Sequence, residues 1–248
     1  NRDDSCTCFP LASTNASVRQ SRPGAAKLGS CTGLSANSAS PAHSANRLPK
    51  VPPITTTLIL MNVMIYALGI ATGPDIVRVF GLWPPGSGGA FHVWQLITYS
   101  FLHGSLPHMG FNMVAIWMFG AALEKRWDDL RYLLTYLLSV AVAAMTQIAV
   151  SGYFLLHPSG PVIGASGGVF GLLLAYALYF PNRVIIIIFL PFIRIPARTF
   201  VLGYGIVELF LGVTNTTSGV AHFAHLGGLF GGWLGVQYFR GRGLFGKR

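Results

Sequence analysis

The sequence predicts an all-α, polytopic membrane protein, and three observations support this fold class. Hydrophobic residues make up 52% of the 248 residues and charged residues only 10%, whereas soluble domains carry about 25% charged residues. The mean hydropathy is +0.55. The apolar residues form continuous runs instead of alternating with polar ones, which favours membrane-spanning helices over the strands of a barrel.

Residues 1–50 differ from the rest of the chain. They are rich in Ser, Ala, Asn, Pro and Arg and show no apolar periodicity. We predict that this segment is disordered, because such a composition cannot bury a core. For its cysteines, Cys6, Cys8 and Cys31, we expect neither a disulfide framework nor a metal site.

Six apolar segments follow, each near the length of about 20 residues that spans a bilayer as a helix. They define a predicted six-helix domain over residues 51–241, followed by a short basic tail, residues 242–248. The expected spans are Ile54–Ala71, Pro107–Leu123, Leu130–Val150, Val162–Phe180, Thr199–Val213 and His222–Phe239. A shorter apolar run, Val184–Leu190, lies between two prolines, and we place it at the membrane interface.

Lysine and arginine alternate between the two sides of these six spans. Three connections carry only Arg78, whereas the N-terminal segment, the other two connections and the tail carry all the remaining basic residues. The positive-inside rule then places both termini in the cytoplasm. The formal net charge of +10 is explained by this topology, so we expect no nucleic-acid partner. We expect a multi-pass protein of the inner cell membrane. The Ser and Arg content of residues 1–50, with few acids, also resembles an organellar transit peptide, so an organellar membrane is the less favoured alternative.

The first polar motif is Gly164-Ala165-Ser166-Gly167, at the outer end of the fourth predicted span. Polar groups in a membrane segment are costly and usually functional. Small neighbours leave the hydroxyl of Ser166 accessible and allow another backbone to come close. The alternative is a contact between helices through small residues, including Gly171.

The second motif is His225, near the start of the sixth span. Gly228 and Gly232 follow it at a four-residue spacing that flattens one helix face, and the fourth span carries a glycine pair at the same spacing. If the two glycine faces pack together, His225 and Ser166 lie at one membrane depth. The alternative is a histidine that bonds a backbone carbonyl.

The third motif is His108 with Asn112, four residues apart and therefore on one helix face. Two neutral donors near a nucleophile suit a developing oxyanion. Alone, the pair would be interpreted as a helix cap or a bond between helices. Three polar groups on separate helices, all at the outer face by the charge pattern, together indicate a catalytic site.

The order and spacing of these motifs, from about residue 91 to residue 239, resemble those of the rhomboid family of intramembrane serine proteases. The matching residues are His103, His108-Met109-Gly110-Phe111-Asn112, Glu124-Lys125-Arg126, Gly164-Ala165-Ser166-Gly167 and Ala224-His225-Leu226-Gly227-Gly228. The resemblance implies a bacterial-type bundle of six helices, and a Ser-His dyad with Ser166 as nucleophile and His225 as base. It also implies an oxyanion hole from His108, Asn112 and the Ser166 N–H, and no metal or cofactor.

The resemblance implies further supporting residues. Phe170 falls where the family often packs an aromatic ring on the histidine. Gln147 and Ser139 lie near positions that hold hydrolytic water, although Ala143 stands where a second serine can occur. The supporting residues are thus expected to be Gly164, Gly167, Phe170, Gly228 and Gln147.

The acidic residues predict a site without a catalytic carboxylate. Five of them fall in the N-terminal segment or at the cytoplasmic end of the spans, which leaves Asp75 and Glu208. We expect neither to approach His225, so that neutral amides at these positions retain most activity. Glu208 is expected to form a structural hydrogen bond. His222, one turn before His225, is an alternative base, but the glycine offsets favour His225, and we assign His222 a structural role.

The predicted function is cleavage of single-span or membrane-anchored proteins near the outer face of the bilayer. One alternative is a non-catalytic rhomboid-like protein that binds membrane clients, but both the serine and the histidine are present. Another is a metal transporter that uses the histidines His92, His103, His108, His222 and His225. Transport favours acidic ligands in the spans, where only Glu208 qualifies.

The topology can be tested at the C-terminal tail. A membrane-impermeant reagent should label residues Arg240–Arg248 only from the cytoplasmic side, because an excess of basic residues is typical of cytoplasmic segments. Labelling of the tail from outside intact cells would overturn both the topology and the shared depth of the polar motifs.

Overall fold

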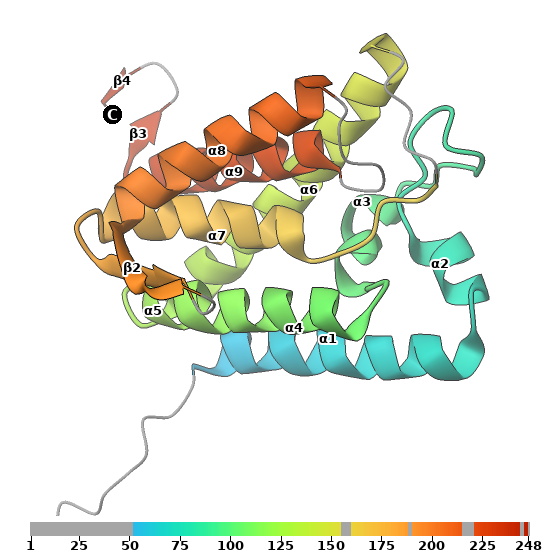
Figure 1. Ribbon diagram of the computed structural model, residues 1–248, viewed down its shortest axis with the longest axis horizontal. Helices are drawn as coiled ribbons and strands as arrows, with labels where there is room; N and C mark the ends of the chain where they lie inside the picture. The colour runs from blue at the N-terminus through green and yellow to red at the C-terminus, as the bar shows by residue number, and fades with distance from the viewer. Residues whose placement is uncertain (1–51, 155–159, 188–189, 215–220, 244–245, 248) are drawn as a thin grey trace, which may run out of the picture. The chain divides into compact units, whose positions relative to one another are not determined.

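The computed structural model describes residues 52–154, 160–187, 190–214, 221–243 and 246–247, most of them helical (Figure 1). The predicted disordered segment, residues 1–50, lies outside this part of the chain. The helices are α1 (Pro53–Thr72), α2 (Asp75–Phe80), α3 (Gln95–Thr98), η1 (Tyr99–Phe101), α4 (Leu106–Ala115), η2 (Ile116–Gly120), α5 (Ala121–Glu124), α6 (Asp129–Phe154), α7 (Ser166–Tyr179), α8 (Ala197–Thr214) and α9 (His222–Phe239).

Among the described residues, four helical stretches are long and apolar enough to cross a membrane. They match the first, second, third and fifth predicted spans to within a few residues, and they are Pro53–Thr72, Leu106–Glu124, Asp129–Tyr153 and Ala197–Thr214. Helix α7 is apolar but has only 14 residues, and α9 coincides with the sixth expected range. The polytopic helical class is therefore confirmed, while the count of six spans stays a prediction.

The fourth predicted span, Val162–Phe180, begins too early. The helix starts only at Ser166, because the residues before it pair with another segment. Val162 and Leu82 exchange two backbone hydrogen bonds, of 2.8 and 3.0 Å, and Gly164 has a φ of 127°, which favours glycine. The chain therefore enters α7 as an extended segment, which leaves Ser166 at the helix terminus.

Two short hairpins are exceptions to the all-α prediction. Strand β1 (Val184–Ile187) pairs antiparallel with β2 (Leu190–Pro196), across most of the run that we expected at the membrane interface. Strand β3 (Arg242–Gly243) pairs with β4 (Gly246–Lys247) in the basic tail. The first hairpin joins α7 to α8 (Figure 1).

Helix α9 packs against α6, α7 and α8, and glycines allow its backbone to reach that of α7. A methyl group on Gly228 would collide with the carbonyl oxygen of Gly167, and one on Gly232 with the backbone of Gly171. The two glycine faces noted in the sequence thus meet. This contact brings the N-terminal turns of α7 and α9 together.

Glu124, at the end of α5, caps the start of α1. Its carboxylate accepts hydrogen bonds from the backbone N–H groups of Ile54 and Thr55, both at 2.8 Å, and from the Thr55 hydroxyl at 2.6 Å. The carboxylate is buried, and its negative charge lies at the favourable end of the α1 dipole. These bonds fix α1 beside the second membrane-length stretch.

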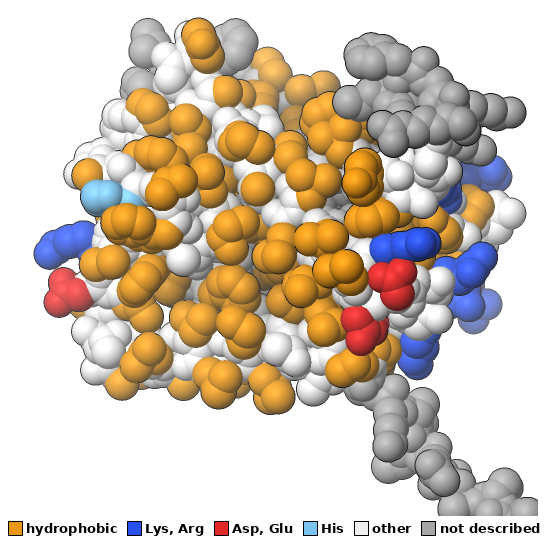
Figure 2. Space-filling view, turned by 180° about the vertical axis from the view of Figure 1, so that it is seen from behind, with side chains coloured by type: hydrophobic (Ala, Val, Ile, Leu, Met, Phe, Trp, Pro, Cys, Tyr) orange, Lys and Arg blue, Asp and Glu red, His pale blue; other side chains and the backbone are white. Residues whose placement is uncertain are grey.

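Apolar side chains cover the exposed faces of the membrane-length helices. Leu60 and Ile70 on α1, and Leu202 and Phe210 on α8, are all more than half exposed. Figure 2 shows apolar side chains spread over one face of the molecule, with Lys and Arg mainly at one edge. Exposed apolar surface of this extent indicates contact with lipid.

The α7–α9 contact can be tested by adding one methyl group. Gly232→Ala should lower stability by about 1–3 kcal/mol, because two backbones would have to separate. Gly203→Ala in α8 is a matched control, since no atom of the described residues lies within 4 Å of a methyl group there, and it should leave stability unchanged or raise it. Thermal unfolding in detergent measures both variants, and equal effects would contradict the close contact.

Candidate active site

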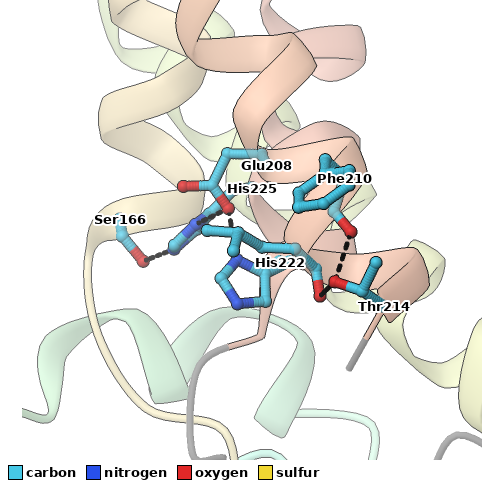
Figure 3. Close-up of polar contacts among 7 residues, drawn as sticks. Ser166, Glu208, Phe210, Thr214, His222 and His225 are labelled. Atoms are coloured by element: carbon cyan, nitrogen blue, oxygen red, sulfur yellow. Dashed lines mark hydrogen bonds and ion pairs between the residues drawn. The ribbon is translucent and has the colours of Figure 1, made fainter. Parts of the chain in front are cut away.

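Ser166 and His225 meet where the N-terminal turns of two helices converge (Figure 3). Ser166 is the first residue of α7 and His225 the fourth of α9. Nε2 of His225 lies 2.9 Å from Oγ of Ser166, a hydrogen-bond distance. The side chain of His225 is 13% exposed. A hydroxyl in contact with an imidazole in this way can be activated as a nucleophile.

The segment before Ser166 is held in place by Tyr99, which lies in the connection between the first and second predicted spans. The N–H of Gly164 donates to the carbonyl oxygen of Tyr99 at 3.0 Å. The Tyr99 hydroxyl in turn donates to the carbonyl of Val140 in α6, also at 3.0 Å. The position of Ser166 therefore depends on α6 as well as on its own helix.

The start of α7 also offers backbone donors. The first N–H groups of a helix have no partner within that helix, and its N-terminus carries a partial positive charge. Ser166 and Gly167 supply the first two of these groups. A negative charge that develops beside Ser166 is stabilised at this place.

Phe170 lies flat on the imidazole of His225. The ring centroids are 4.3 Å apart and the planes differ by 8°. Tyr204 of α8 contacts the same phenylalanine, with a centroid distance of 4.9 Å. Phe170 therefore fixes the plane of the imidazole ring, and Tyr204 in turn packs against Phe170. Phe170 was expected in this position on the histidine from the resemblance.

A carboxylate does reach His225, so the prediction that none would is wrong. Oε2 of Glu208 lies 3.0 Å from Nδ1 of His225 and 2.7 Å from Nδ1 of His222 (Figure 3). Asp75 is exposed and pairs with Arg78 at 3.5 Å.

Glu208 follows Thr199, the first residue of the fifth predicted span, by more than two helical turns, which suggested a place near mid-span. Counted back from Thr214, the last residue of α8, Glu208 lies less than two turns from the C-terminal end of the helix. Helix α9 begins beside that end and packs along α8. The sequence did contain a signal for this contact. Glu208 is the one acidic residue inside a predicted span, and the next span begins with two histidines one turn apart, His222 and His225.

The structure brings His108 to the site. A methyl group built on Gly164 would lie 2.8 Å from Nε2 of His108 and 3.8 Å from Oγ of Ser166, so both side chains border the same glycine. Asn112 is buried, and its Nδ2 donates to the carbonyl of His108 at 2.9 Å. One amide hydrogen of Asn112 is thus used within its own helix, and a second remains for another acceptor.

Gln147 and Ser139 lie on α6 and are both buried. Nε2 of Gln147 contacts Oγ of Ser151 at 3.2 Å, and its Oε1 has no hydrogen-bond partner within the described ranges. The Ser139 hydroxyl donates to the carbonyl of Thr135 at 2.7 Å. Of the two side chains, Gln147 therefore has the acceptor that a water molecule would need.

His103 belongs to the site, although its role was not deduced from the sequence. Burial, and secondarily the neighbouring His108 ring, lower the pKa of His103 to about 4. The ring is therefore neutral at physiological pH, and its Nε2 accepts a long hydrogen bond, of 3.5 Å, from the N–H of Ala165. His103 thus helps to hold the residue before Ser166.

The fold and the site define a polytopic helical membrane protein with a Ser-His pair at the ends of two packed helices. A family model of the rhomboid domain matches residues 90–242, and the chain belongs to the rhomboid family.

Named relatives agree with this assignment. The chain is similar to rhomboid protease GluP of Bacillus subtilis, at 29% identity over 203 residues, which cover 79% of this chain and 37% of GluP. It is similar to rhomboid protease GlpG of Salmonella newport, at 32% identity over 124 residues, which cover 50% of this chain and 42% of GlpG. The matched part thus spans less than half the length of either relative.

Proposed function

We propose that this protein is an intramembrane serine endopeptidase that cleaves membrane-anchored proteins. The observation that carries the proposal is the 2.9 Å contact between Ser166 and His225, in a chain that belongs to the rhomboid family. The relatives GluP and GlpG are named as proteases, which supports the same reaction.

In the first half of the reaction, Oγ of Ser166 attacks the carbonyl carbon of the scissile peptide. The hydroxyl proton passes to Nε2 of His225 as the new C–O bond forms, and the carbonyl π electrons move onto its oxygen. Collapse of this intermediate breaks the C–N bond. His225 returns the proton to the leaving amine, and an acyl ester on Ser166 remains.

The second half repeats these steps with water. A water molecule gives a proton to His225 and attacks the ester carbon, and Oγ of Ser166 leaves with the proton that His225 holds. Water has to reach a site surrounded by apolar helices. Within the described part of the chain, Oε1 of buried Gln147 has no hydrogen-bond partner, which supports a role for this residue in holding such water.

The negative oxygen of each intermediate needs donors beside Ser166. The N-terminal N–H groups of α7 and the ring of His108 are suited to this role, and we assign the second amide hydrogen of Asn112 to it as well. Gly164 keeps the space between His108 and Ser166 open, since a side chain there would meet the His108 ring.

We place the reaction near the outer face of the inner membrane, with both chain termini in the cytoplasm. The distribution of lysine and arginine in the sequence supports this orientation. A single-span substrate must leave its helix there, because its peptide groups are otherwise hydrogen-bonded.

The proposed reaction requires both members of the Ser-His pair. Ser166→Ala and His225→Ala should each abolish cleavage of a single-span substrate in detergent, because one lacks the nucleophile and the other the base. Thermal unfolding checks that each variant is folded. Persistent cleavage by a folded Ser166→Ala protein would exclude the mechanism.

The oxyanion donors should have graded effects. Loss of one donor costs about 10²–10³ in rate in soluble hydrolases, and we expect a smaller loss for Asn112→Ala because one of its hydrogens is used within α4. His108→Ala should cost more. Cleavage rates measured at saturating substrate test the order, and an unchanged rate in the double variant would remove both residues from the mechanism.

A further inference from the structure

The contacts at the site continue beyond the Ser-His pair. Oγ of Ser166 lies 2.9 Å from Nε2 of His225, and the other ring nitrogen of His225 lies 3.0 Å from Oε2 of Glu208. We propose that Glu208 is a positioning residue for His225 and stabilises the imidazolium that forms during catalysis. This inference rests on the proposed protease function and replaces the two-residue site expected from the sequence with a three-residue one.

Burial makes the carboxylate of Glu208 dependent on these contacts. The residue is 3% exposed, and an ionised carboxylate in an apolar environment is very costly unless donors or positive charges compensate it. Two imidazole nitrogens contact the same oxygen, Oε2. A carboxylate maintained in this place has a larger role than the structural hydrogen bond expected from the sequence.

The carboxylate also selects the tautomer of His225. A carboxylate only accepts hydrogen bonds, so it favours a proton on the nearer nitrogen, Nδ1. The lone pair of Nε2 is then free to receive the proton of Ser166. Without Glu208 the reverse tautomer, which cannot act as a base toward Ser166, becomes available.

The resting contact is close but not aligned. Nδ1 of His225 makes no hydrogen bond among the described residues, although its distance to Oε2 is only 3.0 Å. The imidazole is stacked on Phe170 with nearly parallel planes. We infer that transfer of the serine proton, which makes His225 positive, draws Nδ1–H into line with Glu208.

His222 holds the carboxylate from the other side. Its Nδ1 lies 2.7 Å from Oε2 of Glu208, in a buried hydrogen bond. His222 is the first residue of α9, one turn before His225. It therefore fixes the oxygen that His225 needs and prevents Glu208 from adopting other rotamers.

The same three side chains are of kinds that bind metal ions, and their ligand atoms lie within 4.8 Å of one another. In a tetrahedral zinc site each ligand atom lies about 2.0–2.2 Å from the ion. The ligand atoms are then farther from one another than two atoms that share a hydrogen bond. Here both nitrogens contact the carboxylate oxygen directly, at 2.7 and 3.0 Å. Direct contact favours hydrogen bonding over metal ligation.

The test is the isosteric variant Glu208→Gln, compared with Glu124→Gln. We expect Glu208→Gln to lower kcat by about 10- to 100-fold with KM changed by less than about threefold, because positioning of the base affects the transition state and not substrate binding. We expect less than the loss of about 10⁴-fold known for a soluble triad, because the resting contact is not aligned. A single-span substrate in detergent gives both constants.

Glu124→Gln removes the charge from the other buried glutamate in the described part of the chain. It should lower thermal stability, because Glu124 caps α1, while kcat per folded molecule stays within about threefold of wild type. If both variants lose kcat in proportion to their loss of stability, Glu208 is only structural and the inference is wrong.

If Glu208→Gln does not fold, Glu208→Asp serves instead, since it keeps the charge but withdraws it from His225. A folded Glu208→Asp protein with wild-type kcat would overturn the inference. Labelling of Ser166 by a fluorophosphonate separates the two proposals. If wild type neither cleaves nor labels, both fail; if wild type and Glu208→Gln react at equal rates, only the role of Glu208 fails.

Metal binding is tested on the purified wild-type protein. We expect no stoichiometric metal and no change in cleavage after chelation. Loss of cleavage on chelation, with recovery in Zn²⁺ and loss of bound metal in Glu208→Gln, would overturn the positioning role.

Discussion

The site depends on the direct contact between the backbones of α7 and α9. Because Gly228 lies against Gly167 and Gly232 against Gly171, the two helices approach more closely than side chains would allow. Helices in lipid gain no hydrophobic energy from association, so close van der Waals packing is the main force available to them. The same glycines that stabilise this pair of helices place Ser166 and His225 within hydrogen-bond distance of each other.

The two buried glutamates show how differently one side chain can be used in a membrane protein. Glu124 accepts from two backbone N–H groups and a hydroxyl, and none of these partners gains or loses a proton near neutral pH. Glu208 contacts two imidazoles, which are side chains able to take up and return a proton during a reaction. The first carboxylate is suited to fixing a helix end, and the second to responding when a proton moves.

Much of the site was predictable because helical spacing and charge placement report depth along a span. They placed Ser166, His225 and His108 at one face, and the paired glycines indicated which helices meet. The contact of Glu208 was missed because its depth was judged from the start of its span, and spacing alone does not report which faces of neighbouring helices point to each other. The extended entry to α7 was missed too, since apolar Val162 and Ile163 fit a helix or a strand equally well, and only pairing with Leu82 decided between them.

The place of His225 in its helix gives a physical reason for a neighbouring carboxylate. His225 is the fourth residue of α9, and Ser166 opens α7. Two helix N-termini, each with a partial positive charge, therefore face the reacting groups. These charges stabilise an oxyanion but oppose a positive imidazolium at the same place. Glu208, 3.0 Å from Nδ1, supplies the negative charge that offsets this opposition. A site built only from helix N-termini would favour one charge of the transition state and disfavour the other, and the carboxylate allows both to form together.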